Sequence, residues 1–74
     1  MTKTDAKLIA ENLVQKADLK GYKAVFVEVA KRQPQPNDWT VLFNLYAPDN
    51  SLFDTPLIVI VNDATGEAKF FTTL

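Results

Sequence analysis

The chain has 74 residues, of which 47% are hydrophobic and 11% aromatic, and its formal net charge is −1. A chain of this length forms one domain, which we expect to span 1–74, and it buries only about 60% of its unfolded surface, so its stability depends on the core or on a partner. The lack of cysteine excludes disulfides and thiolate metal sites, and the balanced charge argues against nonspecific nucleic-acid binding, which needs a strong positive field.

Residues 4–18 are predicted to form a helix. Thr2 or Thr4 can cap its N-terminus, and Gly21 can supply the positive φ angle that often follows a helix. The apolar residues at helical spacing form one stripe, made of Ala6, Ile9, Ala10, Leu13 and Ala17 with Val14 at its edge. Leu8 falls on the opposite side, where a single exposed leucine needs no special function.

Four strand-like segments follow the helix. Residues 23–31 alternate with Val25, Val27 and Val29 on one face, and residues 39–46 alternate with Trp39, Val41, Phe43 and Leu45 on one face. Residues 56–62 form a continuous apolar run, and residues 67–72 are predicted to pair with it through a turn at 63–66. Polar, proline-marked connections at 32–38 and 47–56 separate the first three segments.

This order predicts an α+β fold in which one N-terminal helix packs on an antiparallel β-meander of three to four strands. Strands without intervening helices favour antiparallel neighbours, because parallel neighbours need long crossover connections.

The helix can cover only one face of such a sheet, and the other face is the candidate binding surface. We expect that face to carry Phe26, Leu42, Tyr46, Ile58 and Ile60. The third strand could instead turn Leu57, Val59 and Val61 outward, which would still leave branched aliphatic side chains there. A contiguous exposed apolar patch usually marks an interaction site. The alternative is that loop 47–56, with Leu52 and Phe53 at its tip, folds over the face.

The sequence offers little for catalysis or metal binding. It has no histidine or cysteine, and Asp49 and Asp54 are the carboxylates best placed in one loop for acid–base work. The oxygen-bearing residues of 49–54 are explained by β-turn chemistry, and those of 62–67 by the hairpin turn. We therefore predict a protein that is not an enzyme, with no catalytic residue, metal ligand or cofactor.

The sequence offers less support for nucleic-acid or membrane partners. Phe26, Tyr46 and Phe71 could stack on bases, but the nearby basic residues Lys23, Lys31, Arg32 and Lys69 are balanced by acids. Trp39 can be read as a partner anchor or as a core residue whose N–H reaches the wet edge. No apolar run reaches membrane-spanning length and the N-terminus does not resemble a secretory signal, so we expect a cytoplasmic location.

The end of the chain, VNDATGEAKFF, resembles that of PepSY domains, where a strand, an aspartate, a small turn and Thr-Gly-Glu lead into a short final strand. The matching residues are Val59, Val61, Asp63, Thr65, Gly66 and Glu67. The chain is also similar in pattern to some small bacterial immunity-type domains, through Trp39, Val41 and Phe43 and through 56–59 with the following Thr-Gly hairpin. These resemblances imply a noncatalytic domain that docks onto or restrains another protein, as PepSY domains are thought to do with peptidases.

Two hypotheses of different kinds follow. The first is a small inhibitory or regulatory interaction module that binds another protein, or itself as a homodimer, through the open sheet face. The second is a domain that holds a small apolar ligand between the sheet and loop 47–56.

Overall fold

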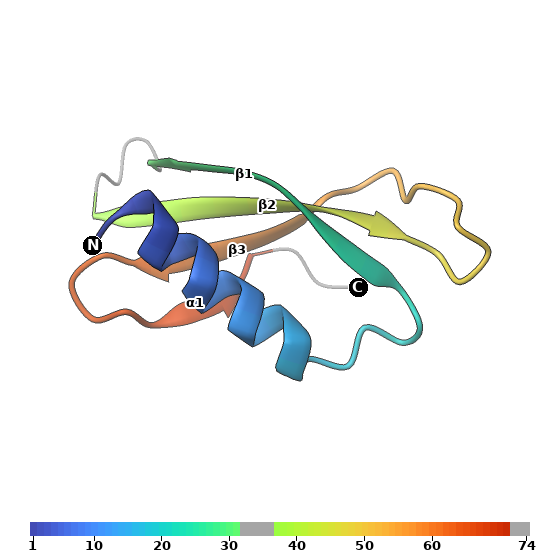
Figure 1. Ribbon diagram of the computed structural model, residues 1–74, viewed down its shortest axis with the longest axis horizontal. Coiled ribbons are helices and arrows are strands. Elements are labelled where there is room, and N and C mark those ends of the chain that lie inside the picture. The colour runs from blue at the N-terminus through green and yellow to red at the C-terminus, as the bar shows by residue number, and fades with distance from the viewer. Residues whose placement is uncertain (32–36, 72–74) are drawn as a thin grey trace.

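The computed structural model describes residues 1–31 and 37–71, and it confirms the predicted α+β fold. One helix precedes a four-stranded antiparallel sheet with strand order β1-β2-β3-β4, so each strand pairs with the next along the chain (Figure 1). The elements are α1 (Lys3–Lys16), β1 (Lys23–Lys31), β2 (Asp38–Tyr46), β3 (Leu57–Asn62) and β4 (Ala68–Phe70). Most of the predicted connection 32–38 lies outside the described residues, as does the predicted end of the last strand at Thr72.

Helix α1 begins with a capping box. The Thr2 hydroxyl accepts a hydrogen bond from the Asp5 N–H, and the Asp5 carboxylate accepts one from the Thr2 N–H. Thr2, rather than Thr4, is therefore the cap, and the arrangement satisfies two N–H groups that have no partner within the helix. Asp5 also places a negative charge at the positive end of the helix dipole.

The helix ends earlier than predicted. Its C-cap is Ala17, which has an extended backbone, and Gly21 does not terminate the helix. Gly21 adopts its expected positive φ, +89°, but in a separate turn in which Lys20 is also left-handed and the Tyr22 N–H donates to the Leu19 carbonyl. The structure thus corrects the role of Gly21 from helix cap to turn residue.

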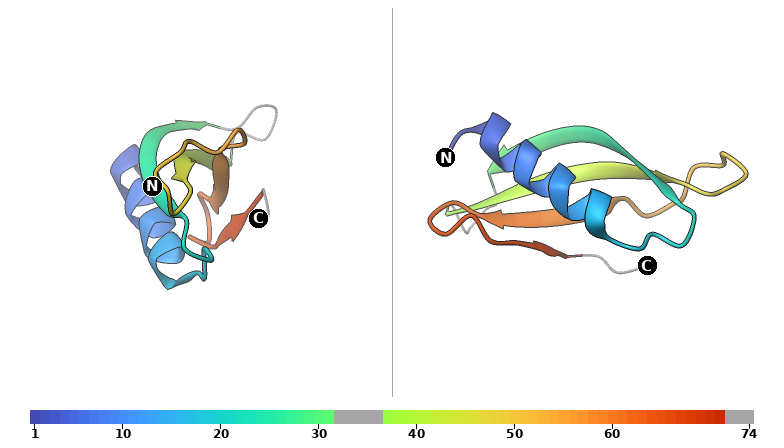
Figure 2. Two further views of the ribbon diagram at one scale, coloured as in Figure 1. Left: turned by 90° about the vertical axis from the view of Figure 1, so that its right-hand side faces the viewer. Right: turned by 60° about the horizontal axis from the view of Figure 1, so that its bottom comes forward.

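The core lies between α1 and one face of the sheet. Ala6, Ala10 and Val14 form the buried stripe of the helix, with Ile9 and Leu13 packed beside them. Small side chains in this stripe let the helix lie close to the sheet, and α1 contacts all four strands. Seen along the long axis of the molecule, the helix lies on one side of a curled sheet (Figure 2). Leu8 is exposed, as predicted.

Most of the core residues that the sheet contributes come from its central strands, β2 and β3. Their buried side chains alternate along β2 and β3 and are Trp39, Val41, Phe43 and Leu45 with Leu57, Val59 and Val61. The register pairs Val41 with Val59 and Phe43 with Leu57, so these residues share the face that meets the helix. This settles the orientation of the third strand: Ile58 and Ile60 point away from α1.

Strand β1 contains a β-bulge that the sequence prediction missed. Phe26 pairs with Phe43 and Glu28 pairs with Leu42, which leaves Val27 as an extra residue between them. A bulge inserts one residue without a partner and changes the phase of side-chain alternation. Ala24, Phe26 and Val29 therefore face the helix, while Val25 and Val27 are exposed. The prediction that Val25 and Val27 face the helix is wrong, and so is the placement of Phe26 on the opposite face.

Two tight connections complete the sheet. The turn between β3 and β4 lies at 63–66 as predicted, with the Asn62 side chain accepting hydrogen bonds from the Ala64 and Thr65 N–H groups and Gly66 at φ +76°. Between β2 and β3, Tyr46 forms a bridge with Leu52 and the Phe53 N–H donates to the Leu45 carbonyl. Residues 45–53 therefore continue the β2–β3 hairpin past the end of the sheet (Figure 1).

Candidate interaction surface

The open face is defined as the side of the sheet turned away from α1. The strand register places on it Lys23, Val25, Val27, Glu28 and Ala30 of β1, Asp38, Thr40, Leu42, Asn44 and Tyr46 of β2, Ile58, Ile60 and Asn62 of β3, and Lys69 of β4. In the described part of the chain no second helix exists to cover this face. An antiparallel sheet with one wet face normally carries polar residues there, so the aliphatic residues in this set call for an explanation.

Two cross-strand rows form the middle of the open face. The first row contains Glu28, Leu42 and Ile58, and the second contains Ala30, Thr40, Ile60 and Lys69. Leu42 and Ile58 are partly exposed, whereas Ile60 is only 4% exposed although it points away from the helix. The centre of the face is therefore aliphatic, and the charged residues of these two rows are Glu28 on β1 and Lys69 on β4.

The two ends of the open face differ in character. Toward the β2–β3 hairpin three apolar side chains are exposed, Val25 at 41%, Val27 at 46% and Leu52, bridged to Tyr46, at 58%, and the exposed Lys23 lies beside them. Toward the β3–β4 turn the surface is polar. A hollow of about 140 Å³ lies there, lined by Asp38, Ile60, Asn62, Glu67, Ala68 and Lys69. The exposed apolar area is thus gathered over one half of the face.

Four of the five predicted binding residues lie on this surface. Leu42, Tyr46, Ile58 and Ile60 share the open face, and Phe26 does not. The Phe26 ring packs edge-on against Phe43 with centroids 6.1 Å apart, and the Lys7 ammonium lies 4.5 Å from its centroid on the helix side. A binding role for the other four residues stays a prediction.

Val25 and Val27 take the place that Phe26 was expected to fill. A sign of this exists in the sequence, because the apolar residues Ala24, Phe26 and Val29 are spaced by two and then by three positions. That spacing is what a bulge between Phe26 and Val29 produces. The regular alternation of Val25, Val27 and Val29 made this spacing hard to recognise.

Loop 47–56 does not fold over the open face. The Asn50 N–H donates to the Ala47 carbonyl and the Ala47 N–H to the Ser51 carbonyl, which closes the tip of the hairpin. Phe53 packs edge-on against Tyr22, with ring centroids 5.5 Å apart. Since Phe53 pairs with the buried Leu45, this contact lies on the helix side of the sheet.

Asp49 serves the hairpin tip, in agreement with its interpretation as a turn residue. Its carboxylate accepts hydrogen bonds from both the hydroxyl and the N–H of Ser51, and these bonds lower the pKa of Asp49. Asn50 is left-handed, with φ +69°, which asparagine tolerates better than most residues. Every one of these contacts satisfies the turn itself.

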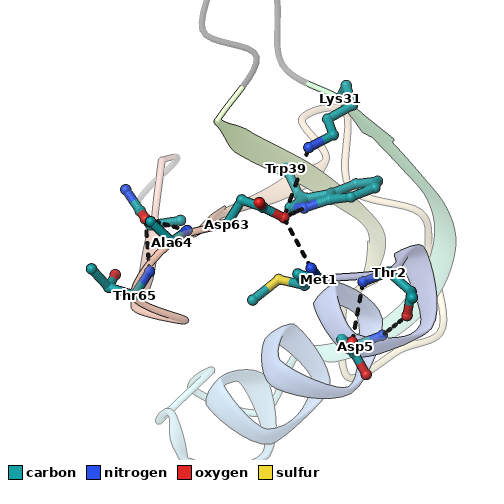
Figure 3. A network of polar contacts seen from close by, with 9 residues as sticks. Met1, Thr2, Asp5, Lys31, Trp39, Asp63, Ala64 and Thr65 are labelled. Atoms are coloured by element: carbon teal, nitrogen blue, oxygen red, sulfur yellow. Dashed lines mark hydrogen bonds and ion pairs between the residues drawn. The ribbon is translucent and has the colours of Figure 1, made fainter.

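A second polar cluster surrounds Asp63, at the polar end of the sheet (Figure 3). Its Oδ1 accepts a hydrogen bond of 2.8 Å from Trp39 Nε1 and lies 3.6 Å from the N-terminal ammonium of Met1 and 3.8 Å from Lys31 Nζ. The indole hydrogen bond, followed by the two positive charges, lowers the pKa of Asp63. Lys31 Nζ also lies 4.1 Å from the Trp39 ring centroid.

The Asp63 cluster joins the ends of the fold. It connects Met1, two residues before the helix, with the last residue of β1, the start of β2 and the β3–β4 turn. Trp39 is 6% exposed, so the tryptophan is a core residue with its N–H at the edge of the core. The N–H donates to the carboxylate of Asp63 in the same chain. The two ammonium groups of this cluster, at Met1 and Lys31, thus both pair with the Asp63 carboxylate.

No described helix is long and apolar enough to cross a membrane, and the described residues contain no group of three or more acidic side chains arranged to hold a metal ion. A further shallow hollow, of about 370 Å³, lies between α1 and β1 and is lined by Lys3, Thr4, Lys7, Phe26, Glu28 and Val29. It meets the open face at Glu28, on the edge that β1 forms.

Comparisons with protein-family models, with curated proteins and with solved structures found no significant match to this chain. The resemblance to PepSY and immunity-type domains therefore stays a prediction.

Proposed function

We propose that this protein is a noncatalytic interaction module, inhibitory or regulatory in role, that binds a protein partner through the open face. The observation that carries the proposal is the pair of partly exposed aliphatic residues Leu42 and Ile58 at the centre of this face, together with the exposed Val25 and Val27. Contiguous exposed apolar surface of this kind is typical of interaction sites. The partner is another protein or a second copy of the chain.

The arrangement of charge supports the same proposal. The middle rows carry charges only at their ends, Glu28 and Lys69, and polar residues gather toward the β3–β4 turn. Protein interfaces commonly have an apolar centre depleted of charge and a polar rim. The role that the PepSY resemblance implies, docking onto another protein, is of the same kind.

The alternative of an apolar ligand held between the sheet and loop 47–56 has less support. The hairpin tip extends along the sheet, and its aromatic residue Phe53 packs on Tyr22. Neither of the two hollows described above is lined by residues of 47–56. Neither hollow therefore provides an enclosing wall from 47–56 for an apolar ligand, as small-molecule sites normally do.

Site-specific photo-crosslinking in cells tests the proposal. A benzophenone side chain is placed at Val25, on the open face, and in a matched variant at Leu8, which is 54% exposed on the far side of α1. We expect defined protein adducts from position 25 and none from position 8. Equal or absent crosslinking at both positions would contradict an interface on the open face.

The mass of the adduct identifies the partner class. Twice the mass of the chain means a second copy, and any other defined mass means a different protein. A melting temperature raised by a small apolar compound in a protein that gives no adduct would favour the ligand-binding alternative.

A further inference from the structure

We propose that the outer edge of β1 is a second interaction site, which takes an extended segment of another protein as an added strand. The segment pairs with residues 28–31 and places an acidic side chain beside Lys3 and Lys7 and the neighbouring basic side chain beside Glu28. The site lies at the edge of the sheet rather than on the open face, so the inference goes beyond the proposed function and does not depend on it.

Strand β1 ends the sheet on one side. The strand order places β2 next to it, and in the described part of the chain no strand lies beyond it. In Figure 1, β1 forms the upper margin of the sheet. The unpaired N–H and C=O groups of an outer strand are a template for one more strand, and an extended polypeptide is the ligand that satisfies them.

The pairing of the other strands shows which backbone groups of β1 are unpaired. The Ile58 carbonyl accepts a hydrogen bond from the Phe71 N–H, so the backbone groups of Ile58 point toward β4 and away from β2. Its cross-strand partner Leu42 therefore directs its own backbone groups toward β1. Leu42 is paired there with Glu28, which means that Glu28 turns its N–H and C=O toward β2.

The outward backbone groups after the bulge belong to Val29 and Lys31. Backbone groups alternate in direction along a strand, so every second residue after Glu28 repeats its direction. Ala30 thus also turns toward β2, where it is paired with Thr40. The N–H and C=O groups of Val29 and Lys31 point out of the sheet, where they offer an incoming strand two donors and two acceptors.

A hollow of about 370 Å³ lies against the same edge. Its strand wall combines Phe26 and Val29, whose side chains face the helix, with Glu28, whose side chain faces the other way. Residues from both sides of β1 can line one hollow only where it passes round the edge of the strand. Lys3 and Lys7 line the wall that α1 forms, about one helical turn apart. A side chain of a docked segment has room beside them.

The charges in the hollow indicate which side chains the segment carries. Within the described residues, Lys3, Lys7 and Glu28 form no ion pair. Lys7 Nζ instead lies 4.5 Å from the Phe26 ring centroid. Successive side chains of a strand point to opposite faces, so one residue of the segment meets the lysines and the next meets Glu28. An acidic residue beside a basic residue complements both sides.

The remaining charges of α1 and β1 do not alter this pattern. They are Asp5, Glu11, Lys16, Lys23 and Lys31, and none of them lines the hollow. Asp5 is held in the capping box and Lys31 in the Asp63 cluster. The segment therefore meets two lysines on the helix side and one carboxylate on the side of the open face.

The bulge limits the length of the docked segment. Outward backbone groups are spaced by two residues on each side of Val27 but by three across it, from Phe26 to Val29. A regular strand cannot follow both halves, so the segment pairs with 28–31 alone. Bulges and short outer strands protect sheets from unselective pairing, and β4 at the opposite edge has only three residues. Selectivity at β1 thus comes from the hollow and its charges.

Peptide selection tests the site. A phage-displayed library of random heptapeptides is selected on the native chain, and the enriched peptides are synthesised. We expect peptides in which an acidic residue stands next to a basic one. Their affinity, measured by calorimetry, should fall by at least about tenfold for Lys3→Glu/Lys7→Glu and for Glu28→Lys, because like charges at an interface are strongly unfavourable.

A matched control separates this effect from general charge changes. Lys16→Glu makes the same change on α1 outside the hollow and should leave the affinity for the peptides unchanged. Circular dichroism of every variant verifies that it is folded, which we expect because Lys3 and Glu28 are exposed and Lys7 is partly exposed.

Amide hydrogen exchange separates strand addition from charge attraction. In the free protein the amides of Glu28 and Ala30 should exchange slowly and those of Val29 and Lys31 rapidly, and a selected peptide at saturation should slow the latter two by at least about tenfold. The peptide is also made in two N-methylated forms, each of which blocks alternate amides. A strand uses only one of these sets to pair with β1, so one form should lose binding and the other should keep it.

Several outcomes would overturn the inference. Failure to enrich any peptide, or enriched peptides that shift the resonances of Leu42 and Ile58 and not that of Val29, would reject the edge of β1 as the site. The second of these results, like crosslinks from Val25, would still uphold the proposed function. Binding that survives the lysine reversals would reject the hollow, and unchanged exchange at Val29 and Lys31 would reject strand addition.

Discussion

The rings of Phe26 and Phe43 meet edge to face across β1 and β2, with centroids 6.1 Å apart and an interplanar angle of 78°. This contact lies on the helix side of the sheet and anchors the first strand in the core. Edge-to-face aromatic pairs contribute about 0.5–1.5 kcal/mol beyond the burial of their surface. Phe26 is therefore a stabilising residue whose neighbour Val25 faces outward.

Truncation of each residue distinguishes the two faces. Phe26→Ala should lower the free energy of unfolding by about 2–3 kcal/mol, less than for a fully buried phenylalanine because Phe26 is partly exposed. Val25→Ala should change it by no more than about 0.5 kcal/mol in the monomer. Urea denaturation measures both values. Similar losses for the two variants would mean that β1 does not have the register described above.

The extra residue in β1 leads to a second prediction. Removal of Val27 joins Phe26 directly to Glu28, and the register with Phe43 and Leu42 then becomes regular on both sides. We expect the deletion variant to fold with a free energy of unfolding within about 1 kcal/mol of the native value, since an exposed bulge residue contributes little packing.

Deletion of Asn44 from the regular strand β2 is the control. It would exchange the faces of every residue on one side of the deletion and should prevent folding. Nuclear magnetic resonance spectra of the two deletion variants separate these outcomes. An unfolded Val27 deletion beside a folded Asn44 deletion would contradict the register.

The capping box gives a prediction about the N-terminus of the helix. Thr2→Ala removes the acceptor of the Asp5 N–H hydrogen bond and should cost about 1 kcal/mol, which is roughly 4–8 °C in melting temperature for a domain of this size. Thr4→Ala, inside the first turn, removes no cap and should be neutral or slightly stabilising. Equal effects of the two changes would be evidence against Thr2 as the cap.

The Asp63 cluster predicts a pH dependence of stability. Because the folded pKa of Asp63 lies below its unfolded value, the ionised carboxylate is favoured by folding. Its contribution is complete above the unfolded pKa, about 4, and is lost as the pH falls through the lower folded pKa. Asp63→Asn removes that contribution, so the difference in unfolding free energy between native and variant protein should be constant near neutral pH and shrink below about pH 4.

Denaturation curves at a series of pH values measure this difference, and Trp39 fluorescence reports the loss of its carboxylate partner. The control is Asp54→Asn, because Asp54 lies in the connection between β2 and β3, away from the Asp63 cluster. A difference that stays the same down to acidic pH would show that the charge of Asp63 does not stabilise the fold.

The turn between α1 and β1 provides the last prediction. A side chain at Gly21 would be strained at φ +89°, and its Cβ would lie 3.2 Å from Cγ of Pro48. Gly21→Ala should therefore lower the free energy of unfolding by about 1–2 kcal/mol. Lys20→Gly, at φ +57°, relieves a left-handed non-glycine residue and should be neutral or stabilising. Thermal unfolding compares them, and an unaffected Gly21→Ala variant would contradict the turn conformation.

Much of this fold follows from local patterns. The stripe Ala6–Ala10 and the alternation Val41–Phe43 each match a single secondary-structure period, so the helix and the central strand were predictable. The β3–β4 turn was predictable because Gly66 and the Asn62 side chain supply its chemistry. These features depend on neighbours in sequence.

The errors have a different origin. Which side chains of β1 face the helix depends on the pairing of β1 with β2. Either set of alternate residues in 23–31 contains apolar side chains. Alternation alone therefore could not decide whether Val25 or Phe26 faces the helix. The orientation of Ile58 and Ile60 was open for the same reason, since every residue of 57–61 is aliphatic. The course of 47–56 depends on the Tyr22–Phe53 contact between distant segments. Four of the five candidate surface residues lie on the open face as predicted. The fifth, Phe26, faces the helix because of the bulge in β1.

The nearest-neighbour order of the strands has a consequence for synthesis of the chain. Each hairpin closes between adjacent segments, which favours rapid pairing, but the helix reaches across the sheet as far as the last hairpin, where Ile9 lies beside Gly66. The first element to leave the ribosome must therefore wait for the last one to bury its apolar stripe. Until residues 57–70 emerge, the helix can contact only β1 and β2 of the sheet, so the part of its apolar stripe that packs on β3 and β4 stays uncovered.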